Sequence, residues 1–348
     1  MRRNGQAHDR ATELLEIPRL TPHLHSVRFV LGPSKIQHTR GTHQEVLTDM
    51  TSQPLPGTAR VEPMTGAGGS RARSHGSQLP LIVHADDFGE TQEITRGICR
   101  GIEAGAVTST SIMANMPGTH DALQRAAALA DRASFGVHLN LSEGGALSAG
   151  RSLVGEDGRL HDKRTLFVAS ITGRLRLAEV EAEITAQIAR VRDSGVRISH
   201  VDGHKHLHQL PVVSAAVANV LPRFGIERVR ITRLGRLTRV RKATTLVREL
   251  LALKASRKFH RARLRSPVRT VDLQPLIAAY RGEEPVPDGL LVDPSGPVEL
   301  CCHPGTAAAD LEKPGSHTRR AELDFLLSPR FRELLLINGA RLVSYWEV

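Results

Sequence analysis

The chain has 348 residues and a formal net charge of +11, with 40% hydrophobic but only 3% aromatic residues. This length suffices for one barrel-sized domain with an appendage or for two average domains. Three cysteines, two of them adjacent, exclude a disulfide framework and indicate a reducing compartment. No apolar run follows Met1-Arg2-Arg3 as in a signal peptide, and no stretch is long and apolar enough to cross a bilayer. We therefore expect a soluble, cytoplasmic protein.

Residues 1–78 differ in pattern from the rest of the chain. They show neither helical nor alternating periodicity over a useful length, and residues 66–70 form a Gly-rich linker. We expect a disordered or poorly structured extension here, with translation starting at Met50 or Met64 as an alternative. Residues 79–348 are then the folded domain.

Short apolar runs and helical repeats alternate from Leu79 onward. The run 79–85 is typical of a buried parallel strand, and apolar residues at three- and four-residue spacing over 177–193 indicate an amphipathic helix. The predicted strands are 79–85, 107–114, 135–141, 197–201, 226–231, 298–302 and 341–346. The predicted helices are 90–103, 120–130, 177–193, 212–224, 319–327 and 331–337, together with 238–263 as one helix or a helical hairpin. This alternation predicts a parallel α/β fold. Polar residues at strand ends along the whole chain favour an irregular, TIM-like (β/α) barrel over an open sheet.

The segment 200–208 contains four histidines and one aspartate in nine residues. An extended chain would place His200, Asp202, His204, His206 and His208 on one face. A turn near Gly203 would instead aim only one or two of the histidines at an ion. This density favours a metal site over a surface loop or buried, hydrogen-bonded histidines.

Three other predicted strands also end in groups that suit a metal site. The groups are Asp86 together with Asp87 on the first of these strands, His138 on the second and His303 on the third. Two imidazoles and a carboxylate on a divalent ion leave positions for water and substrate, and a second carboxylate can act as general base. These parts suit hydrolysis of an amide or ester. Each has a structural alternative: the aspartates could cap the next helix, His138 could be a core histidine, and His303 could be a turn residue.

Four motifs, in this order, resemble the YdjC family of carbohydrate deacetylases, which includes chitooligosaccharide deacetylases and a hopanoid-associated branch. The motifs are His84-Ala85-Asp86-Asp87-Phe88-Gly89, Gly136-Val137-His138-Leu139-Asn140-Leu141, His200-Val201-Asp202-Gly203-His204-Lys205-His206-Leu207-His208 and Cys302-His303-Pro304-Gly305. The resemblance covers residues 79–348. It implies an irregular barrel that removes an N-acetyl group from an amino sugar of an oligosaccharide or glycolipid, using one divalent cation.

The resemblance also implies three metal ligands, a general base and, by analogy with other metal-dependent deacetylases, a general acid. The implied ligands are Asp87, His138 and His204, the implied general base is Asp86, and the implied general acid is His303. We expect Asp202, His206 and His208 around the ion or in the substrate cleft. His84 stands where the family usually has Asn, and we expect it to hydrogen-bond the following loop, with a spare ligand as the alternative. Zn, Mn, Co and Mg all remain candidates, and the imidazoles make Mg the weakest of them.

The positive charge lies mainly in residues 223–269, which contain sixteen Lys or Arg against two Glu. Nucleic-acid binding is therefore an alternative function. The segment contains only two aromatic residues that could stack on bases, Phe224 at its start and Phe259, so we expect no specific nucleic-acid partner. Peripheral membrane contact through this segment would suit a glycolipid substrate. A further alternative keeps the metal site but has it hydrolyse a phosphoester.

Overall fold

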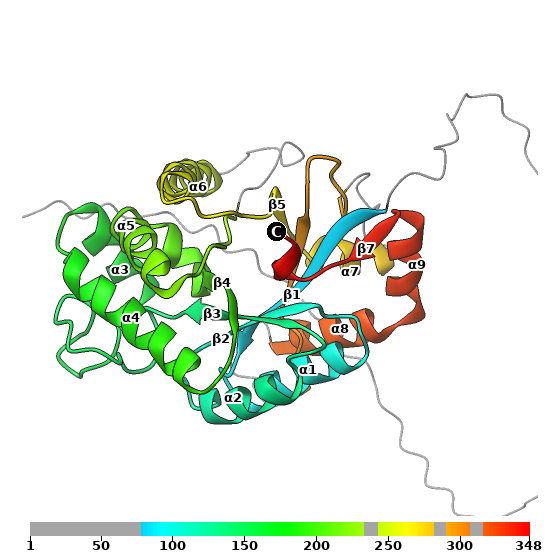
Figure 1. The fold of residues 1–348 in the computed structure, drawn as a ribbon, viewed down its shortest axis with the longest axis horizontal. Coiled ribbons are helices and arrows are strands. Elements are labelled where there is room, and N and C mark those ends of the chain that lie inside the picture. Colours follow the sequence, from blue (N-terminus) through cyan, green and yellow to red (C-terminus); the bar gives the residue numbers. More distant parts are fainter. Residues whose placement is uncertain (1–77, 233–242, 282–289, 307–315) are drawn as a thin grey trace, which may run out of the picture. The chain divides into compact units, whose positions relative to one another are not determined.

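The computed structural model describes residues 78–232, 243–281, 290–306 and 316–348 (Figure 1). The expected extension, apart from Gln78, and residues 233–242 of the basic segment lie outside these ranges. Within them, no helix has the length and apolarity needed to cross a membrane.

In the described part of the chain, seven parallel strands form one sheet. They are β1 (Leu79–Phe88), β2 (Ser109–Ile112), β3 (Ser134–Leu139), β4 (Ile198–Gly203), β5 (Arg269–Asp272), β6 (Val298–Cys302) and β7 (Ala340–Leu342). Their order is β4-β3-β2-β1-β6-β5, and β7 pairs with the first residues of β1. Because all pairs are parallel, the carboxyl ends of the strands meet at one face.

Two isolated parallel bridges connect the two ends of this strand order. Val201 of β4 pairs with Val229, and Arg228 pairs with Arg265, which precedes β5. The amide of Arg230 donates to the carbonyl of Val201 at 3.0 Å. The strand predicted over 226–231 is thus an extended segment held by single bridges. It completes the irregular barrel that the sequence predicts.

Helices cover the outside of the sheet (Figure 1). They are α1 (Gln92–Glu103), α2 (Thr119–Ala128), α3 (Lys163–Ile171), α4 (Leu177–Asp193), α5 (Pro211–Val220), α6 (Ala243–Arg261), α7 (Gln274–Tyr280), α8 (Ser316–Leu327) and α9 (Pro329–Ile337). Side-chain caps fix several starts: Thr91 accepts from the amide of Ile94, and Asp162 accepts from the first amides of α3. The strand expected over 341–346 ends at Leu342 and is followed by a 3-10 turn, Tyr345–Glu347.

The two faces of β1 meet different surroundings. Leu81, Val83 and Ala85 are buried in the main apolar core between sheet and helices. His84 and Asp86 alternate with them and are also buried, but contact polar groups. The outer layer at β1 is therefore apolar, and the interior around His84 and Asp86 is polar.

Candidate active site

Asp87, His138 and His204 come together at the carboxyl ends of β1, β3 and β4. Asp87 Oδ1 lies 3.0 Å from His204 Nδ1 and 3.3 Å from His138 Nε2. One ligand atom from each residue lies within 4.8 Å of the others. Asp87 and His138 are buried, and His204 is partly exposed. These are the three residues predicted as metal ligands, so the fold brings the predicted set together. We call them the open cluster.

Unusual backbone angles occur at Asp87 and directly after His204. Asp87 has φ +69°, in the left-handed region that L-residues rarely adopt, where the pairing of β1 with β2 is irregular. β4 ends at Gly203, and a 3-10 turn, His204–Gln209, follows with Lys205 and His206 at positive φ. A Cβ at Gly203 would lie 2.8 Å from His208 Nδ1, so the turn requires glycine there. The alternation of the histidine segment therefore stops at Gly203.

The two later histidines of the turn have other partners. His206 Nδ1 lies 3.1 Å from Thr232 Oγ1. His208 is buried, and its Nε2 donates to the carbonyl of Arg230 at 3.0 Å. Burial lowers the pKa of His208 to about 4, so it is neutral. Among the described residues, only His204 of these three histidines is grouped with Asp87.

Carboxylates orient both imidazoles of the open cluster. His138 Nδ1 lies 2.8 Å from Asp202 Oδ1, which leaves Nε2 facing Asp87. Burial opposes protonation of His138, but Asp202 and Asp86 hold its pKa well above the ordinary value. His204 Nε2 lies 3.4 Å from Glu143 Oε1, which also binds Lys205 Nζ. The contact with His204 lowers the pKa of Glu143 to about 2. Sequence reasoning missed Glu143, which lies in the loop after β3.

Asp86, the predicted general base, is held by Arg230. The guanidinium donates to both carboxylate oxygens, at 2.9 and 2.7 Å, and also contacts Asp202 and Glu299. Although burial opposes ionisation, Arg230 keeps the pKa of Asp86 well below its usual range, so Asp86 is an anion. His303 Nε2, the predicted acid, lies 3.8 Å from Asp86 Oδ2.

Two arginines near the site were not predicted as site residues. Arg230 was counted only as part of the basic segment, yet it lies between apolar Val229 and Ile231 in a predicted strand. A charge there indicates a buried polar partner. Arg319 of α8 donates to Asp87 Oδ2 at 2.7 Å and to Glu90 at 3.2 Å. Arg319 lies in a predicted helix, and its sequence surroundings gave no comparable indication of a buried polar partner.

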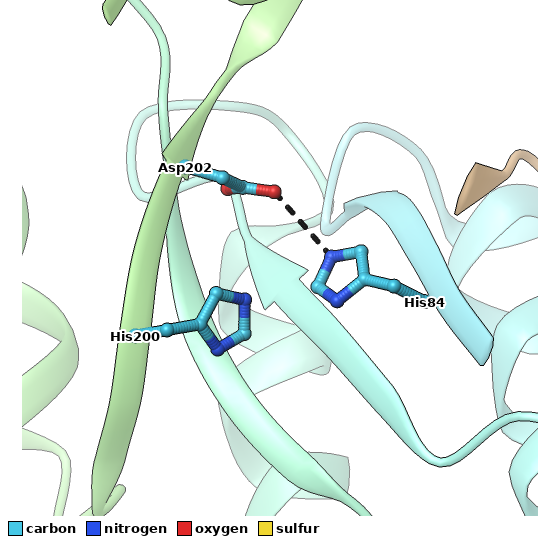
Figure 2. Close-up of side chains that lie close together, drawn as sticks. All are labelled: His84, His200 and Asp202. Carbon is cyan, nitrogen blue, oxygen red and sulfur yellow. Dashed lines mark ion pairs between the residues drawn. The ribbon is translucent and has the colours of Figure 1, made fainter. Parts of the chain in front are cut away.

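A second group of the same residue types lies deeper in the barrel: His84, His200 and Asp202 (Figure 2). We call it the buried cluster. His84 Nε2 lies 3.4 Å from Asp202 Oδ2 (Figure 2), and its two nitrogens lie 2.9 and 3.1 Å from serine hydroxyls of β2. The His200 ring stacks on Tyr345 at 3.6 Å. The expected bond from His84 to the following loop is wrong, because its hydrogen-bonding partners are on β2.

A parallel barrel with carboxylates and imidazoles at the carboxyl ends of its strands has the architecture of a barrel enzyme. A family model described as YdjC-like protein matches residues 80–336. The chain belongs to this family.

Curated relatives agree with this assignment, and one solved structure supports the fold. A carbohydrate deacetylase of Mus musculus is 40% identical over 164 residues, covering 45% of this chain and 51% of the mouse protein. One of Xenopus laevis is 29% identical, covering 78% of this chain and 98% of the frog protein. The chain spans about half the length of the Danio rerio, Mus musculus and Homo sapiens relatives. An Enterococcus faecalis protein named for cellobiose-phosphate cleavage superposes with a TM-score of 0.60, 77% and 98% coverage and 23% identity, and so supports the fold alone.

Proposed function

We propose that this protein is a metal-dependent hydrolase that removes the N-acetyl group from an amino sugar in an oligosaccharide or glycolipid. The observation that carries the proposal is the convergence of Asp87, His138 and His204 beside an ionised Asp86. Membership of the YdjC family and relatives named carbohydrate deacetylase support the same reaction.

The donor set fits one divalent ion. Asp87 would supply an oxygen and His138 and His204 a nitrogen each, and Asp202 already orients the His138 ring as metal-binding histidines are usually oriented. Zn, Mn and Co suit two imidazoles better than Mg does. When bound, the ion would supply Lewis-acid activation of water and of the acetyl carbonyl.

The neighbouring groups divide the proton transfers. Asp86 accepts the proton of the attacking water, and the Arg230 guanidinium fixes the direction of its carboxylate. His303, on the loop after β6, donates a proton to the leaving sugar amine. Its side chain is 36% exposed, so it can meet a substrate entering from solvent.

Acetate release tests the proposal. Purified protein is treated with EDTA and resupplied with single divalent ions, with N-acetylglucosamine oligosaccharides and glycolipids as substrates. We expect release that chelation abolishes and one ion restores. Asp86→Asn should retain the ion and lose most turnover. Undiminished turnover in Asp86→Asn would refute the assignment of the base, and phosphate release from phosphoesters without acetate release would refute the reaction.

A further inference from the structure

Helix α6 carries large apolar side chains on its outer face. Leu246, Val247, Leu250 and Leu253 are 52%, 43%, 50% and 38% exposed. They follow one another at spacings that place them on one side of a helix. Four such residues over two turns form a continuous apolar surface, which monomeric soluble proteins rarely leave uncovered.

The packing of α6 fixes this outward orientation. The opposite face buries Ala252, Ala255 and Phe259 completely. Lys258 Nζ holds the helix to α5, at 2.5 Å from the carbonyl of Pro211 and 3.2 Å from Ser214 Oγ. Turning the leucines inward would break these contacts, so their exposure belongs to the folded state.

The same outer face becomes cationic toward the carboxyl end of the helix. Lys254, Arg257 and Arg261 are exposed and continue the three- and four-residue spacing of Leu250 and Leu253. Over its full length α6 contains five Lys or Arg and one Glu. An apolar half followed by a cationic half suits lipid chains together with acidic headgroups.

The helix also lies close to the site. It packs on α5 and on the turn His204–Gln209, which supplies His204 of the open cluster. In Figure 1 it lies above α5. A surface bound by α6 would therefore be near the carboxyl ends of the strands.

We propose that the outer face of α6 docks on a membrane surface containing anionic lipids. Leu246, Val247, Leu250 and Leu253 enter the boundary between headgroups and acyl chains, and the cations bind phosphate groups. The docking proposal deepens the proposed function and rests on it for its catalytic benefit. Docking would bring the site within reach of amino sugars carried by lipids. We favour a bilayer over a second copy of the chain because a second α6 would bring like charges together.

Vesicle co-sedimentation of the full chain tests the docking. The probes are vesicles of phosphatidylcholine alone and of equal parts phosphatidylcholine and phosphatidylglycerol. We expect binding to the anionic vesicles that weakens in high salt, and roughly tenfold weaker binding for Leu250→Asp. The matched control is Leu336→Asp on α9, whose leucine is 76% exposed and lies outside this face. It should bind like the unaltered protein.

Three results would overturn the docking proposal. One is absence of binding to anionic vesicles, and another is equal weakening by Leu250→Asp and Leu336→Asp. The third is a dimer in sedimentation velocity that Leu250→Asp dissociates, because the face would then join two copies. Acetate release from soluble oligosaccharides should be unchanged in Leu250→Asp. Failure of that reaction in every variant, with vesicle binding intact, would instead refute the proposed function.

Discussion

The open and buried clusters contain the same ligand types, one aspartate and two histidines with donor atoms within 4.8 Å. Their surroundings differ. In the buried cluster both His84 nitrogens lie near serine hydroxyls, so neither is left facing an open position. An arginine contacts the aspartate of each cluster, Arg230 at 2.9 Å from Asp202 Oδ2 and Arg319 at 2.7 Å from Asp87 Oδ2, so this contact does not distinguish them. In the open cluster His204 reaches solvent and Asp87 Oδ1 faces both imidazoles. Residue type alone therefore does not distinguish a metal site from a structural network.

The two clusters are also linked through Asp202. One of its oxygens lies 2.8 Å from His138 Nδ1 and the other 3.4 Å from His84 Nε2. The buried cluster thus fixes the orientation of one proposed ligand of the open cluster. Variants in the open cluster should change activity, and variants in the buried cluster should first change stability.

Asp87→Ala should have the largest effect. It removes the carboxylate that faces both imidazoles, so acetate release should fall roughly thousandfold, about 4 kcal/mol of activation free energy. Steady-state kinetics measure the change, and circular dichroism checks the fold. Asp162→Ala, which removes only an exposed helix cap, is the control. Equal activity in Asp87→Ala and the control would show that Asp87 does not belong to the active site.

Arg230→Met should cause the largest loss of stability. It leaves the buried carboxylates of Asp86, Asp202 and Glu299 without their guanidinium, which should cost about 3–5 kcal/mol of unfolding free energy. Urea denaturation measures it. Arg265→Met, which breaks only the exposed pair with Glu227, should cost less than about 1 kcal/mol. Similar costs for the two variants would contradict the structural role of Arg230.

Gly136→Ala should have a smaller effect, confined to the buried cluster. An added Cβ would lie 2.5 Å from the His200 ring, and overpacking of this kind costs about 1–3 kcal/mol. Thermal unfolding measures it against Gly145→Ala, where a Cβ meets nothing within 4 Å. Combining Gly136→Ala with His200→Ala should cost less than the sum of the two single changes. A strictly additive double variant would show that the ring is not the obstacle.

The smallest effect concerns pH. Burial holds the pKa of His200 well below its ordinary value, so the folded state keeps this ring neutral. The unfolded chain takes up a proton near pH 6.5, so the stability linked to His200 is present above that pH. It is lost on acidification, by at most about 1.4 kcal/mol per pH unit. His200→Phe should therefore lose less unfolding free energy than the unaltered protein between pH 7.5 and about 5.5. An equal loss of unfolding free energy in the two proteins over this pH range would mean that His200 is charged in the folded state.

The sequence predicted most of the fold, because long periodic segments such as α4 carry strong signals. The elements it missed include β5 with 4 residues and α7 with 7, which are too short for periodicity to show. Polar residues at several strand ends predicted that side chains converge at one face of a parallel barrel, and the family resemblance implied which three of them form the open cluster. The sequence could not predict the Arg230 contact with Asp86, because 144 residues separate them. Nor could it show that His206 and His208 turn away, which depends on positive φ angles after Gly203.

Metal content tests the central claim most directly. Unaltered protein, His204→Ala and His84→Asn are each dialysed against zinc and then against buffer, and bound metal per chain is measured by mass spectrometry. His84→Asn introduces the residue that the family usually has at this position, within the buried cluster. We predict one ion in the unaltered protein and in His84→Asn, and none in His204→Ala. An ion retained by His204→Ala but lost from His84→Asn would contradict the account and place the metal in the buried cluster.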